Sequence, residues 1–267
     1  MISIAILGNK GGISKTTNAV NLAAAAARRG LRVLLVDTDG QGSATRTVGL
    51  QPVDAFKALI VDDAEFADVI QMAPLEFAGA PLAVIGASVG QRIVGADPQT
   101  PGRIYERFQE LRGVFDLVVF DTSPSVSETH AGVMFVCDFV LLPVTLDEAA
   151  VAGLEVTRQF LQQAARAGVH AGYPSAAPLG VVVNQARLGE QLEQQFYRWL
   201  IETYGSLVIR DPLRYMGVWK QAGAMRRSIY EWSPEDSFGA RRWAPVAARE
   251  FDAAVWAPVA QVMGVRS

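Results

Sequence analysis

The chain has 267 residues, of which 50% are hydrophobic and 19% are charged, and its formal net charge is −3. This composition is typical of a globular protein with a full core, and we predict a single domain over residues 1–267. No apolar run is long enough to span a bilayer. The one cysteine excludes a disulfide framework or a thiolate metal cluster. Because Met1 leads directly into an apolar stretch, we also expect no signal peptide and a cytoplasmic setting.

A strand, a glycine-rich loop and a helix are predicted at the start of the chain. The apolar run 2–7 predicts the strand and the alanine-rich run 18–29 predicts the helix. In such a loop, glycines let backbone N–H groups close around an anion, and the helix N-terminus adds partial positive charge. We expect Lys15 to offset β/γ-phosphate charge and Thr16 to hold Mg²⁺. The motif therefore predicts a nucleoside triphosphate site made by Gly11, Gly12, Ile13, Ser14, Lys15, Thr16 and Thr17.

Carboxylates follow two further predicted strands. The strand 32–36 leads into Asp37-Thr38-Asp39-Gly40, and the strand 115–121 ends at Asp121. Continuous apolar strands that alternate with helices predict an α/β fold with a doubly wound, mostly parallel sheet, and ligands bind beyond the carboxyl ends of its strands. We expect Asp121 to hold Mg²⁺ through water. Asp37 and Asp39 fit the same site, with ordinary turn formers as the alternative.

The remaining elements are predicted from hydrophobic periodicity. We expect Cys137 to be a buried thiol and His130 to be structural. We expect a loop over residues 96–102. The predicted strands cover residues 82–85, 138–144, 179–183 and 207–210. The predicted helices cover residues 53–72, 103–111, 147–167 and 189–203.

The loop resembles that of the ParA/MinD family of deviant P-loop ATPases, which reads K-G-G-x-x-K-[ST]. Ser14 and Gly40 depart from the family, which has glycine and proline at these places. The resemblance implies that ATP and Mg²⁺ are the cofactors and that Lys10 crosses a dimer interface to the partner's phosphates. It also implies that Asp39 orients the attacking water and that Asp37 supports the Mg²⁺ shell. It further implies that Asn184 reads the adenine edge and that Pro212 lies in a loop beside the base.

The segment 210–249 holds eight cations and four anions, with interleaved aromatic residues. This pattern is typical of a surface that binds phosphate backbone, with a solvated helix face above core aromatics as the alternative. ParA-type ATPases bind DNA without sequence preference as ATP-bound dimers, so the resemblance favours DNA binding. The tail 251–267 lacks a basic amphipathic helix, and we therefore expect no membrane binding. The candidate DNA-binding residues are Arg226, Arg227, Arg241 and Arg242.

Taken together, the sequence resembles a small ParA-type partition ATPase without an N-terminal DNA-reading domain. The resemblance implies a nucleoid-associated homodimer whose slow ATP hydrolysis is stimulated by a ParB-like or other adaptor and releases DNA. Three alternatives stay open: a MinD-like ATPase on a membrane surface, a metabolic P-loop enzyme, and a nucleotide-binding scaffold with little turnover. The departures at Ser14 and Gly40 make the last alternative plausible.

Overall fold

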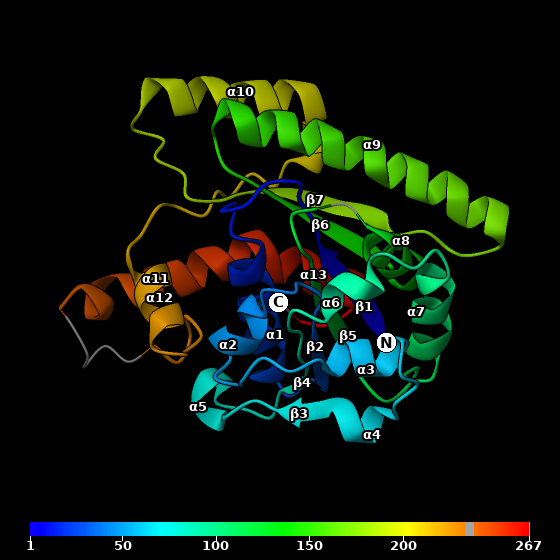
Figure 1. Cartoon of the computed structure of the whole chain (residues 1–267). Helices are drawn as coiled ribbons and strands as arrows, with labels where there is room; N and C mark the ends of the chain where they lie inside the picture. Colours follow the sequence, from blue (N-terminus) through cyan, green and yellow to red (C-terminus); the bar gives the residue numbers. More distant parts are fainter. Residues whose placement is uncertain (126, 233–237, 267) are drawn as a thin grey trace.

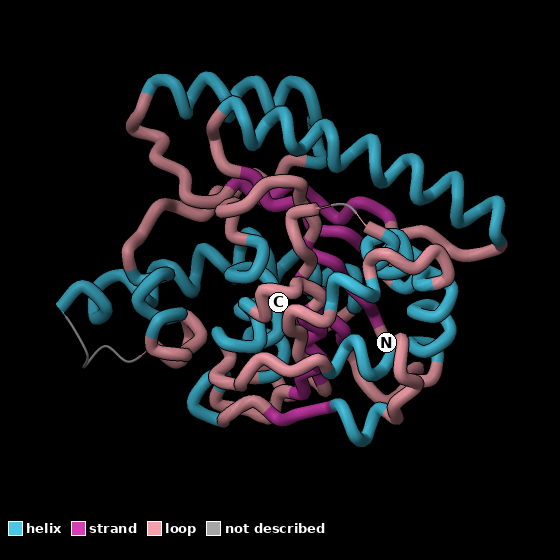
Figure 2. The backbone as a smooth tube through the Cα atoms, viewed as in Figure 1, coloured by secondary structure: helices cyan, strands magenta, loops and turns pink. Residues whose placement is uncertain are grey.

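A mostly parallel sheet forms the centre of the molecule (Figures 1 and 2). The computed structural model describes residues 1–125, 127–232 and 238–266, and within them the side chains of all but residues 92 and 238–241. β3 pairs with β4 antiparallel, and all the other strand pairs in the described residues are parallel. The prediction of a doubly wound, mostly parallel α/β fold is therefore confirmed. Within the described residues the sheet has seven strands, in the order β3 (Ile70–Met72), β4 (Ala83–Ile85), β2 (Val33–Asp37), β5 (Leu117–Asp121), β1 (Ile2–Ile6), β6 (Phe139–Val144) and β7 (Ala177–Val183).

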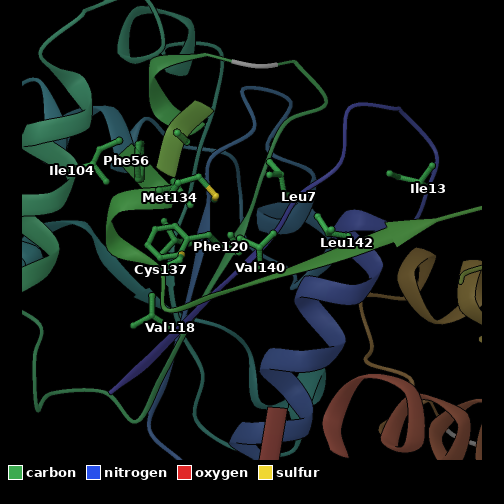
Figure 3. Close-up of a cluster of buried hydrophobic side chains, with 14 of the residues drawn as sticks. Leu7, Ile13, Phe56, Ile104, Val118, Phe120, Met134, Cys137, Val140 and Leu142 are labelled. Atoms are coloured by element: carbon green, nitrogen blue, oxygen red, sulfur yellow. The ribbon is translucent and has the colours of Figure 1, made fainter. Parts of the chain in front are cut away.

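The central strands are buried on both faces, because helices cover the sheet from both sides. Alternate residues of β2 point to opposite faces of the sheet. Leu34 and Val36 pack into one hydrophobic cluster, whereas Val33 and Leu35 pack into the other. Figure 3 shows part of the first cluster, in which the rings of Phe108 and Phe120 lie 5.0 Å apart. The described helices on that face are α3 (Ala55–Ile60), α4 (Phe66–Val69), α6 (Gln91–Val94), α7 (Thr100–Gln109), α8 (Glu128–Val136), α9 (Glu148–Ala171) and α10 (Gln191–Tyr204).

The second face is covered by α1 and by the C-terminal helices. The alanines of residues 23–27 are all buried, and their small side chains let α1 lie close to the sheet. Trp256 packs into the same cluster and is 1% exposed. The elements of this face are α1 (Lys15–Ala27), α2 (Ser43–Thr47), α5 (Leu75–Ala78), α12 (Phe238–Phe251), the π-helical segment η3 (Asp252–Trp256) and α13 (Ala257–Met263).

The prediction of one helix over residues 53–72 is wrong. The chain forms α3, then α4 (Phe66–Val69) and finally the edge strand β3. Asp63 has a φ of 57°, a left-handed conformation that a continuous helix does not allow. Residues 70–72 then find backbone partners in β4, so pairing at the sheet edge overrides the helical pattern.

Two other predicted boundaries are also wrong. Residues 205–207 form a 3-10 helix, η1 (Gly205–Leu207), and Val208 makes an isolated bridge to Val181 in place of the strand predicted over 207–210. Pro212, which has no N–H to donate, follows shortly and cannot extend such a ladder. The predicted loop 96–102 ends early, because α7 begins at Thr100 and Pro101 fits the first turn of a helix.

The length and apolar content of the described helices decide whether any of them could span a membrane. None of them combines the length and the apolar content that crossing a bilayer requires.

Candidate active site

The glycine-rich loop joins the end of β1 to the start of α1. Gly12 and Ser14 have φ angles of 80° and 71°, so the loop uses the left-handed region twice. Ser14 is the N-cap of α1 but makes no side-chain cap hydrogen bond. The first N–H groups of α1 are therefore not capped by this side chain and can bind an anion. Ile13 points its side chain into the core (Figure 3), so only its backbone can contribute to the loop.

The two lysines of the loop have different partners. Lys15 is 7% exposed and its Nζ donates to the carbonyl oxygen of Lys10 at 2.7 Å. Burial lowers the pKa of Lys15, against the opposing charges of Asp121 and Asp39. Lys10 instead points its Nζ to Asp147 Oδ1 at 2.5 Å. One lysine thus lies within the glycine-rich loop, and the other is held at its rim by the N-cap residue of α9.

Asp37 and Asp121 lie next to each other because they are register partners of β2 and β5. Both are buried, with 0% of each residue exposed. Asp37 Oδ2 accepts hydrogen bonds from the backbone N–H and the hydroxyl of Thr45, at 2.9 and 2.8 Å. The hydroxyl of Thr16 donates to Asp121 Oδ2 at 2.7 Å. Burial raises the pKa of Asp37 to about 6, and burial together with the charge of Asp37 raises the pKa of Asp121 well above 3.8.

These groups fit Mg²⁺. Asp121 Oδ1 is buried and has no hydrogen-bond partner among the described residues. Two buried carboxylates without a cation are unfavourable, and a divalent cation with oxygen ligands would offset both charges. Thr16, Asp121 and Asp37 are therefore the residues that would hold Mg²⁺, either directly or through water.

A cavity of about 490 Å³ opens over the loop. Asp39 lines this cavity and also a second one, of about 430 Å³, on its other side. Its carboxylate is oriented locally, because Asp39 Oδ1 accepts from the backbone N–H of Gln41 at 2.9 Å. The sequence-predicted residues that line the first cavity are Gly11, Gly12, Ser14, Lys15, Thr16, Thr17, Asp39 and Asn184.

At the end of the cavity away from the glycine-rich loop, the lining residues differ from those that the family resemblance implied. Asn184 lines it, and its Nδ2 donates to the carbonyl oxygen of Val182 at 3.1 Å. Pro212 lines a separate hollow instead. Sequence reasoning missed several residues of this wall, although Tyr215 and Trp219 stood out as aromatics among the cations of the C-terminal segment. The missed residues are Gln185, Leu213, Arg214, Tyr215, Met216, Trp219 and Lys220.

Two of the four candidate DNA-binding arginines follow the helix that forms part of this wall. Arg226 and Arg227 come after Met225, the C-cap of α11 (Val218–Ala224), whose Trp219 and Lys220 line the cavity. Arg226 and Arg242 are exposed, and Arg227 is half-buried. The side chain of Arg241 lies outside the described part of α12.

A comparison with protein families matches residues 1–169 to a family described as "AAA domain". The "Sporulation initiation inhibitor protein Soj" of Bacillus subtilis is 33% identical over 160 residues, which cover 57% of this chain and 61% of that protein. The match thus spans less than two thirds of that relative. The "Chromosome-partitioning ATPase Soj" of Thermus thermophilus is 32% identical over 196 residues, which cover 72% of this chain and 74% of that protein.

Solved structures share the fold over the whole chain. The ATP complex of Cyanothece McdA matches with a TM-score of 0.81 and 19% identity, and the match covers 100% of this chain and 98% of that one. At this identity the likeness concerns the fold alone. The ATP in that complex is a ligand of McdA.

Proposed function

Because the chain belongs to the ParA/MinD-type family of P-loop ATPases, we propose that it hydrolyses ATP to switch a dimer between DNA-bound and DNA-free states. The predicted family is thereby confirmed. The relatives named as ATPases support the proposal that this chain hydrolyses ATP, with Mg²⁺ as its metal. Its partition relatives make it a ParA-type positioning ATPase. DNA is the surface along which it would position a cargo.

The hydrolysis step uses residues of the loop and of the strand ends. Lys15 and the N–H groups at the start of α1 offset the charge that develops on the transferred phosphate. Asp39 lies at the junction of the two cavities, where its carboxylate can accept a hydrogen bond from the attacking water. Mg²⁺, when bound by Thr16, Asp121 and Asp37, offsets the charge on the phosphate oxygens.

The dimer is supported by the placement of Lys10. Lys15 already occupies the phosphate loop, so the loop does not need a second lysine for its own nucleotide. Lys10 lies at the rim, and its side chain is 32% exposed. From there it can exchange Asp147 for the phosphates of a second subunit.

The observation that carries the DNA proposal is the position of α11. One end of this short helix lines the nucleotide cavity, and Arg226 and Arg227 follow its other end. The next residues are tied to α1, since the backbone N–H of Ile229 donates to Asn21 Oδ1 at 2.8 Å. The helix that starts at the phosphate loop thus contacts the basic segment directly. A change at the nucleotide can in this way reach the arginines.

The first test measures retention on immobilised non-specific DNA with ATP, with ADP and without nucleotide, at fixed salt. We expect retention with ATP and loss of it in the double variant Arg226→Ala/Arg227→Ala, whose nucleotide affinity stays unchanged. Each lost phosphate contact should lower the salt slope of binding by about 0.9. A matched control removes the exposed Arg112 and Arg166, which also lowers the charge by two. Equal retention of the two double variants would contradict the proposed surface.

Two single variants test the nucleotide cycle. Lys10→Ala should abolish ATP-dependent dimerisation in light scattering while it spares nucleotide binding. Asp39→Ala should stop phosphate release and trap the dimer, because the attacking water loses its acceptor. Normal phosphate release by that variant would contradict the role of Asp39. No release by the unaltered protein, even with a ParB-like adaptor, would favour the scaffold with little turnover.

A membrane-surface role has less support. The C-terminal helix α13 buries Val259 and Ala260 in the core, so these apolar residues are not available to a lipid surface. Vesicle pelleting with ATP would test this alternative. Nucleoid association is part of the proposed DNA-bound state.

A further inference from the structure

Gln185 joins the phosphate loop to the opposite wall of the nucleotide cavity. It directly follows Asn184 at the end of β7, and its side chain crosses to the loop. The Gln185 amide Nε2 donates to the carbonyl oxygen of Gly12 at 2.8 Å and to Ser14 Oγ at 3.0 Å. All three residues line the cavity. One side chain thus ties down two points of the loop that surrounds the phosphates.

Both ends of this contact have an unusual backbone conformation. Ser14 has a φ of 71° and Gln185 a φ of 56°, and the left-handed region is unfavourable for residues that carry a Cβ. Such strain persists where surrounding contacts fix the conformation. A serine at a helix N-cap ordinarily bonds its hydroxyl to the N–H of the first turn. Here the hydroxyl makes no such bond and accepts from Gln185 instead.

We propose that Gln185 is a positioning residue for the phosphate loop, which holds Ser14 in the conformation that glycine would adopt freely. The loop needs the left-handed turn at residue 14, because α1 must begin at Lys15 with its N–H groups directed at the anion. Glycine reaches this conformation without strain. In this chain the serine is held there by an amide from another element.

The contact of Gln185 with Gly12 and Ser14, which we call the clasp, is joined through the backbone to the far wall of the cavity. The backbone N–H of Ala186 donates to the carbonyl oxygen of Leu213 at 3.0 Å. The backbone N–H of Tyr215 donates to the carbonyl oxygen of Ala186, also at 3.0 Å. Gln185 therefore lies between the loop and the segment 213–215, which forms the wall beyond the phosphates. The inference rests on the nucleotide site alone and is independent of DNA binding and of dimerisation.

The test compares three probes on the full chain: ATP with Mg²⁺, tripolyphosphate with Mg²⁺, and adenosine. In Gln185→Leu the loop loses two hydrogen bonds. We expect the affinity for ATP and for tripolyphosphate to fall about tenfold, and that for adenosine to stay within twofold. Adding Ser14→Gly to this variant should recover at least a threefold part of the loss, because glycine no longer needs the clasp. If Gln185 only stabilised the fold, its loss would instead weaken binding of all three probes alike.

The matched control is Gln194→Leu. Gln194 lies on α10, and its side-chain Nε2 donates to the carbonyl oxygen of Leu188 at 2.6 Å. It should leave all three affinities unchanged. An equal loss for adenosine in Gln185→Leu would overturn the proposal, because Gln185 would then be a base contact. Unchanged tripolyphosphate binding, or the absence of rescue by Ser14→Gly, would also overturn it. If the leucine variant does not fold, Gln185→Asn gives the same comparison, since the shorter amide cannot reach both acceptors. Failure of the unaltered protein to bind ATP would refute the nucleotide site itself.

Discussion

The buried pair Asp37 and Asp121 makes the stability of the metal-free protein depend on pH. The pKa of Asp37 is raised to about 6 by burial, against 3.8 in the unfolded chain. The folded state therefore holds this proton over a pH range in which the unfolded state has lost it. Asn at position 37 cannot ionise, so Asp37→Asn removes the pH dependence that Asp37 contributes to the free energy of unfolding.

The raised pKa of Asp37 fixes both the direction and the size of the pH effect on the free energy of unfolding. A raised carboxyl pKa means that the free energy of unfolding is highest below pH 3.8 and falls as pH rises towards about 6. A shift from 3.8 to about 6 corresponds to about 3 kcal/mol, at 1.36 kcal/mol for each pKa unit. Asp121, which is also raised, extends the loss to higher pH. The proposed Mg²⁺ site needs the ionised carboxylates, so the affinity for Mg²⁺ should increase about tenfold for each unit by which the pH rises, up to about pH 6.

The assay is urea unfolding between pH 4.5 and 7.5, in EDTA and with saturating Mg²⁺ and ADP. In EDTA the unaltered protein should lose about 2 kcal/mol relative to Asp37→Asn across this range, because about 1 kcal/mol of the effect is already lost below pH 4.5, and with Mg²⁺ and ADP the loss should disappear. Asp116→Asn is the control, because hydrogen bonds from Arg32 lower the pKa of Asp116 to about 2 and it stays ionised throughout. Parallel pH profiles for the unaltered protein and Asp37→Asn would refute the reasoning.

Three further outcomes are expected. Asp147→Asn keeps an N-cap acceptor for the N–H of Ala150 but removes the charge that holds Lys10, so light scattering should show ATP-dependent dimers at lower protein concentration. Weaker dimers would contradict this. Trp256→Ala should lower the unfolding free energy by about 3 to 5 kcal/mol in urea, because the ring is fully packed; a loss below 1 kcal/mol would show that the C-terminal helices do not belong to the core. Tyr215→Ala should weaken adenosine binding about fivefold in calorimetry and spare tripolyphosphate, since Tyr215 is one of the residues that line the cavity beyond the glycine-rich loop. Equal weakening of both would place the ring at the phosphates.

Much of the fold could be predicted from the sequence. The central strands are short, continuous apolar runs, and their order along the chain with helices between them favours a parallel sheet. Cys137 is buried as predicted, and burial raises the pKa of its thiol. The failures lie where a short segment has no strong local preference. Residues 70–72 became a strand because β4 offered backbone partners, which the local pattern does not contain.

The glycine-rich loop could be found without the structure, because residues 8–17 are contiguous and the phosphate binding predicted for them depends mainly on local backbone shape. It also placed carboxylates after two strands, since parallel strands end at one edge of the sheet. Which distant groups meet there became known from the packing of the folded chain. It put Asp37 beside Asp121, Asp147 on Lys10 and Gln185 on Ser14. These pairs join residues far apart in the chain, and their distances depend on how the helices pack against the sheet.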